Sequence, residues 1–203
     1  QHWKQNAQKS IYLIKKLREK TGIDLLINGG DILTKETTKA LAYAKMSNFI
    51  SELESTGCAV YSCIGNHEFN NPNMSQDSAD LAITLSLEEV CSVLYDRQIY
   101  NNAVFDSTSG CYYIDIKKTR IFVLQCNYGS NVYLTATRWV LEQMTQIPNG
   151  YNVMLFSHVV VEWSEDISSS VPKDRVQAVL NAMDAIKSKT SITYEGRTYD
   201  YST

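Results

Sequence analysis

One stretch decides the fold: Cys58-Ala59-Val60-Tyr61-Ser62-Cys63-Ile64, followed directly by Gly65-Asn66-His67-Glu68. The apolar run predicts a buried strand, and the glycine predicts where that strand ends. The strand therefore delivers an amide, an imidazole and a carboxylate at its carboxyl end. In an open α/β sheet, the carboxyl ends of the strands are where ligands bind.

The same arrangement occurs twice more along the chain. Upstream, the run Ile23-Asp24-Leu25-Leu26-Ile27-Asn28 ends in Gly29-Gly30-Asp31. Downstream, Tyr151-Asn152-Val153-Met154-Leu155-Phe156 ends in Ser157-His158. A helix is expected over 38–55, between the first two strands, and strand–helix–strand alternation is typical of a parallel α/β sheet. Three strands that each end in a metal-competent side chain indicate a functional site.

The remaining elements follow from periodicity and turn residues. Helices with one apolar face are expected at 4–20, 86–95, 135–147 and 172–187. A tight turn between the short runs 110–116 and 120–125 predicts an antiparallel hairpin, and 192–201 predicts a second one. Residues 69–80 are rich in Asn, Ser and Pro, which predicts a polar loop.

Composition limits the class of protein. The 203 residues are 44% apolar and 20% charged, which fits one domain with a full hydrophobic core. A net charge of −3 argues against a general nucleic-acid binder, and no apolar run approaches the roughly 20 residues that span a membrane. The cysteines have no CxxC spacing, which favours free thiols in a reducing compartment such as the cytoplasm. They are Cys58, Cys63, Cys91, Cys111 and Cys126.

The side chains at the strand ends are ligands for divalent metals. Carboxylate and amide oxygens suit Mn, Mg or Fe, whereas imidazole suits Fe, Zn or Mn. Taken singly, Asp31 and Asn66 also fit ordinary turn residues. The histidines favour function, because the chain has only three and two of them, His67 and His158, follow apolar strands.

The order Gly30-Asp31, Gly65-Asn66-His67-Glu68, His158 resembles the calcineurin-like metallophosphoesterase superfamily. The motifs of that superfamily run D-x-H, G-D, G-N-H-[D/E], H and G-H-x-H. The resemblance implies a four-layer α/β/β/α sandwich with mixed sheets and a dinuclear site at the strand exits. It also implies two divalent ions (Mn, Fe, Zn or Mg) and hydrolysis of a phosphate monoester or diester by a bridging hydroxide. The substrate would be a phosphate-ester small molecule or a phosphorylated partner.

The resemblance also implies a role for each matching residue. Asp31 would bridge both metals, and Asn66 and His158 would bind the second one. His67 would not bind metal; it would contact the phosphate and stabilise or protonate the leaving group. Glu68 is interpreted as a supporting carboxylate behind the ligands.

Two motifs of the superfamily are not intact. His2, 29 positions before Asp31, is interpreted as the metal-binding histidine of D-x-H, whose aspartate would precede Gln1; a disordered terminal histidine is the alternative. No histidine follows His158, so G-H-x-H is expected beyond Thr203. Residues 1–203 are thus expected to form one incomplete metallophosphoesterase domain that is weakly active or inactive alone.

Two other functions remain open, and the substrate is not readable. The chain could be a binding or structural module with a degenerate site on the same fold, or a nuclease of the same superfamily. Residues 69–80 and 162–171 follow ligand-bearing strands, so Asn70 and Trp163 are candidates for the substrate rim. Their alternative interpretation is as ordinary loop residues.

Overall fold

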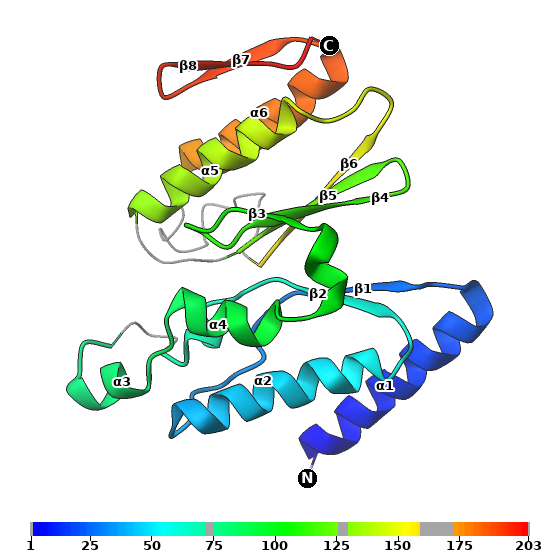
Figure 1. The fold of residues 1–203 in the computed structure, drawn as a ribbon, viewed down its shortest axis with the longest axis vertical. Coiled ribbons are helices and arrows are strands. Elements are labelled where there is room, and N and C mark those ends of the chain that lie inside the picture. The colour runs from blue at the N-terminus through cyan, green and yellow to red at the C-terminus, as the bar shows by residue number, and fades with distance from the viewer. Residues whose placement is uncertain (1, 72–74, 126–129, 159–172, 203) are drawn as a thin grey trace. The chain divides into compact units, whose positions relative to one another are not determined.

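The computed structural model describes residues 2–71, 75–125, 130–158 and 173–202 (Figure 1). The chain has a mixed α/β fold and divides into two compact units, residues 1–101 and 102–203, each described here by itself. Among the described helices, none is long and apolar enough to cross a membrane.

The first unit is built around two parallel strands. Leu25 pairs with Ala59 and Asn28 pairs with Ser62, so both strands end at the same edge. The loops that carry the predicted site residues therefore leave side by side. The elements are α1 (His2–Thr21), β1 (Leu25–Asn28), α2 (Lys39–Glu54), β2 (Ala59–Ser62), η1 (His67–Phe69), α3 (Ser78–Ile83), α4 (Leu87–Leu94) and η2 (Gln98–Asn102).

Local sequence explains where the helices of this unit begin. The side chain of Thr38 accepts a hydrogen bond from the N–H of Leu41 and starts α2. Ser86 and Glu89 form a capping box that starts α4, as their spacing predicts. One expectation is wrong: residues 69–80 are not one continuous loop, because η1 ends inside that range and α3 begins there.

A hydrophobic core holds α2, β2 and α4 of the first unit together. Its buried members come from each of these elements, from the loops after β1 and β2, and from the connection between α3 and α4. They include Leu33, Ala42, Met46, Ile50, Val60, Ile64, Leu85, Val90 and Leu94. This packing fixes the positions from which the site loops depart.

The second unit contains a four-stranded sheet in the order β3-β4-β5-β6. The first three strands are antiparallel and β6 is parallel to β5, so the sheet is mixed, and both predicted hairpins are confirmed. The elements are β3 (Val104–Phe105), β4 (Tyr112–Ile116), β5 (Thr119–Leu124), α5 (Ser130–Met144), β6 (Asn152–Ser157), α6 (Lys173–Ser188), β7 (Ser191–Tyr194) and β8 (Arg197–Asp200).

Helices α5 and α6 cover one face of this sheet, and the β7–β8 hairpin lies on the other side of the helices (Figure 1). Phe122 and Leu124 of β5, and Val153 and Leu155 of β6, pack into the core that the helices form. Successive side chains of a strand point to opposite faces. Val123 and Gln125, like Met154 and Phe156, therefore point away from the helices.

Arg120, the second residue of β5, carries a buried charge that makes four hydrogen bonds. Its guanidinium donates two hydrogen bonds of 2.8 Å to the carboxylate of Asp115 and further bonds to the carbonyls of Gln143 and Gln146. It also lies 4.0 Å from the centre of the Tyr113 ring. These bonds tie the sheet to the end of α5 and satisfy the buried charge.

Candidate active site

The carboxylate of Glu68 joins the two loops that leave β1 and β2. The side chain is 0% exposed and accepts hydrogen bonds from three backbone N–H groups, those of Asp31 (2.9 Å), Ile32 and Gly65 (2.6 Å). Bonds from N–H groups to a carboxylate are among the stronger hydrogen bonds and compensate for its burial. We call this arrangement the Glu68 clamp; it fixes residues 31–32 against the start of the second loop.

Asp31, in the first loop, has a left-handed backbone conformation. Its φ is 59°, and that of the preceding Gly30 is 93°. Aspartate tolerates this region better than most residues, but the conformation persists only where its surroundings enforce it. Here the Glu68 clamp holds the N–H of Asp31, and the Asn28 side chain accepts a bond from the N–H of Gly30 at 3.3 Å.

Asn66 and His67 stand directly beside Asp31. The carboxylate of Asp31 accepts a hydrogen bond from the backbone N–H of His67 at 3.3 Å. Asn66 precedes η1, and its side chain does not cap that turn. The Nδ1 atom of His67 is buried, with no hydrogen-bond partner among the described residues. A polar atom in this state is a point where a ligand or water gains a favourable bond.

His158 belongs to the second unit. It follows β6 directly, is half-buried, and its backbone N–H donates to the carbonyl of Leu124 at 3.4 Å. The structure thus brings Asp31, Asn66, His67 and Glu68 together in the first unit, whereas His158 belongs to the second unit.

The other predicted residues have different outcomes. His2 is the first residue of α1, but its side chain lies outside the described residues, as does Trp163. Asn70 is 0% exposed, and its amide bonds to both backbone groups of Glu36 and to the carbonyl of Ile83. All of its amide groups are therefore used inside the protein, and a place on the substrate rim is not supported for Asn70.

Sequence reasoning missed Gln125, the residue that directly follows β5. Its side chain is 7% exposed, and neither its Oε1 nor its Nε2 has a hydrogen-bond partner among the described residues. The signal was available, because Gln125 is a polar residue at the exit of an apolar strand, as Asn66 and His158 are.

The donor types at the strand exits fit a hard divalent metal. The Asp31 carboxylate and the Asn66 amide are held on neighbouring loops, and such oxygens suit Mn or Mg. Within the described ranges, no group of three or more His, Cys, Asp or Glu side chains is close enough to hold a metal ion. The described cysteines are free thiols, and burial raises the pKa of Cys91 on α4 to about 11, which disfavours a thiolate at that residue.

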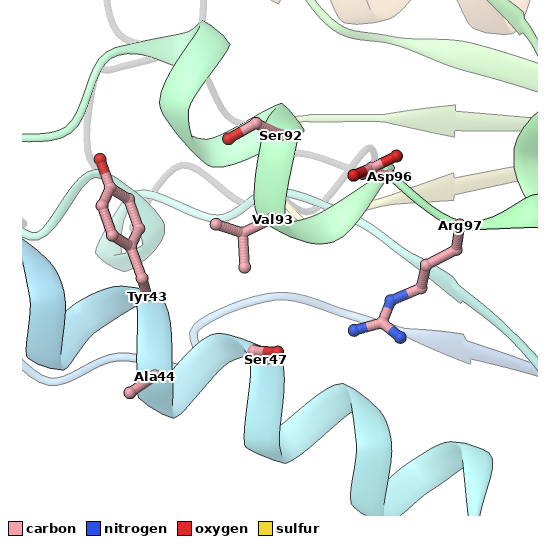
Figure 2. A pocket seen from close by; sticks show the side chains of 7 residues that line it. All are labelled: Tyr43, Ala44, Ser47, Ser92, Val93, Asp96 and Arg97. Carbon is pink, nitrogen blue, oxygen red and sulfur yellow. The ribbon is translucent and has the colours of Figure 1, made fainter.

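A separate hollow lies between α2 and α4 (Figure 2). Its volume is about 610 Å³, and none of the predicted site residues lines it. The guanidinium of Arg97, at one end of the hollow, is paired with the carboxylate of Glu54 at 2.8 Å. The hollow is therefore not part of the strand-exit site.

Comparison with known proteins identifies the family of the chain. The model of the calcineurin-like phosphoesterase family matches residues 2–185. A comparison with curated proteins found no match. Members of the family are typically hydrolases of phosphate esters. Because the match spans most of the chain and includes both loops joined by Glu68, the chain belongs to the calcineurin-like phosphoesterase family.

Proposed function

We propose that the protein is a metal-dependent hydrolase of phosphate monoesters or diesters that acts at the strand exits of β1, β2 and β6. The observation that carries the proposal is the Glu68 clamp, which holds Asp31 beside Asn66 and His67. We further propose that residues 1–203 belong to one catalytic domain with the four-layer α/β/β/α architecture.

The proposed metal ligands are the side chains of Asp31, Asn66 and His158, together with His2. Asp31 would be shared between two divalent ions (Mn, Fe, Zn or Mg), Asn66 and His158 would hold one ion, and His2 would hold the other. When bound, such ions neutralise charge on phosphoryl oxygens and activate water for attack. Support comes from the donor chemistry and from the left-handed backbone of Asp31, whose side chain is exposed.

His67 is the proposed general acid. An imidazole exchanges protons near neutral pH, so it can contact the phosphoryl group and give a proton to the leaving-group oxygen. Its backbone N–H is fixed by the carboxylate of Asp31, which keeps the imidazole next to the proposed metal ligand. The buried Nδ1 atom, with no partner among the described residues, leaves the ring able to bond to a ligand.

The test replaces Asp31 by asparagine in the protein at its full natural length. We expect hydrolysis of p-nitrophenyl phosphate and bis(p-nitrophenyl) phosphate to fall by about 100-fold or more, because a shared anionic ligand is lost. Elemental analysis should show less bound metal. Asp24→Asn is the matched control, since Asp24 is an exposed carboxylate just before β1 and should leave both readouts unchanged.

Two results would contradict the proposal. Retained activity in Asp31→Asn would refute the role of Asp31. A wild-type protein that binds no metal and hydrolyses neither ester would favour a degenerate binding module.

A further inference from the structure

Gln125 is an exception among the buried polar groups of its strand. Arg120, at the other end of β5, is 5% exposed, and its guanidinium bonds to Asp115 and to two carbonyls. Gln125 is almost as buried, yet both polar atoms of its amide are without a partner among the described residues. Buried amides are nearly always hydrogen-bonded, and those that are not call for an explanation.

The sheet register places Gln125 next to His158. Leu124 pairs with Ser157 on parallel strands, and the N–H of His158 still donates to the carbonyl of Leu124. Gln125 and His158 are therefore the next pair along these strands, about 5 Å apart in the direction of the hydrogen bonds.

Both side chains also point to the same face. Phe122 and Leu124 of β5, like Val153 and Leu155 of β6, face the core under α5 and α6. By alternation, Gln125 and His158 face the opposite side. A buried amide without a partner thus shares a face and a register position with the proposed metal ligand of the second unit.

We propose that Gln125 is a substrate-binding residue whose Nε2 donates a hydrogen bond to a phosphoryl oxygen of the ester bound beside His158. This inference rests on the proposed phosphoesterase function. A phosphoryl oxygen is an anionic acceptor, so it satisfies the amide donor that the described protein groups leave unsatisfied. The Nε2 group is a hydrogen-bond donor only, so its bond to the phosphoryl oxygen does not compete with the metal ligands. Its Oε1 is left to accept a hydrogen bond from a hydroxyl of the ester or from water.

The test compares Gln125→Met with wild type in the protein at its full natural length. Methionine keeps the length of the side chain but cannot donate a hydrogen bond of this kind. We expect KM for p-nitrophenyl phosphate and the inhibition constant for inorganic phosphate to rise together, by about 10- to 100-fold, with kcat changed less. The melting temperature should stay constant or rise by a few degrees, because a buried amide without a partner has been removed.

The control variant is Thr119→Val, which removes a polar group at the opposite end of β5 and should change neither KM nor phosphate inhibition. A lower melting temperature or failure to fold in Gln125→Met would show that the protein itself satisfies the amide, and would overturn the inference. Unchanged KM and phosphate inhibition in an active enzyme would overturn it while leaving the phosphoesterase proposal intact. A wild-type protein without activity would overturn both.

Discussion

Replacing Glu68 by glutamine tests whether the clamp holds the site loops in place. Oε2 accepts from the N–H groups of Asp31 and Gly65, and Oε1 accepts from that of Ile32. In the less damaging orientation the new NH₂ group takes the place of Oε1 and faces the N–H of Ile32, so donor meets donor in a buried position. One charge-assisted bond worth about 1.5–3 kcal/mol is lost, and the other two become neutral bonds of about half the strength.

These changes together should lower the free energy of unfolding by about 3–5 kcal/mol, a large part of the roughly 5–15 kcal/mol typical of a domain. The measurement is urea unfolding, in which the midpoint should fall while the slope stays constant. Glu88→Gln is the matched control, because Glu88 is exposed on α4 and should change the free energy by less than about 0.5 kcal/mol. A Glu68→Gln protein within about 1 kcal/mol of wild type would refute the clamp as the element that fixes these loops.

Two more predictions concern stability. Arg120→Met should cost about 1–3 kcal/mol, because the carbonyls of Gln143 and Gln146 lose this buried donor, whereas the Asp115 side chain is 34% exposed and can be hydrated. Arg197→Met, which breaks the exposed pair with Glu142, should cost less than about 1 kcal/mol, and equal losses in urea unfolding would contradict this. The second concerns Glu89, whose pKa is lowered from 4.5 to about 2 by the backbone N–H of Ser86, by Lys39 and by Tyr43. Because the folded-state pKa is the lower one, this stabilisation is complete above pH 4.5 and is lost as the pH falls towards 2. Glu89→Gln should therefore flatten the dependence of the unfolding free energy on pH in that window, and an unchanged slope would argue against the bonded carboxylate.

The sequence predicts the elements whose signals are local. The parallel pair β1–β2 follows from apolar runs that end in glycine, and the start of α4 follows from the spacing of Ser86 and Glu89. Both hairpins follow from alternation and turn residues. The short elements η1 and α3 escape prediction because a single turn or two of helix has no periodicity to detect.

The site is predictable in its residue types but not in its contacts. Motif order identifies Asp31 and Asn66, yet the partners of Glu68 lie up to 37 positions away in the chain. Asn70 is a second residue whose contacts are not predictable from sequence. It resembles a surface loop residue, but it is buried and bonds to Glu36, 34 positions upstream. Such long-range bonds depend on how the strands and helices pack, and no local pattern encodes them.

The Glu68 clamp grips main-chain atoms only. Its three donors are peptide N–H groups, so the clamp itself makes no bond to the side chains of Asp31 and Asn66. The side chain of Asn66 can therefore change, in evolution or by engineering, while the clamp beneath it stays in place. Position 31 is more restricted, because its φ of 59° favours aspartate, asparagine or glycine. A fold with this property can alter the ligand at position 66 without a new loop to present it.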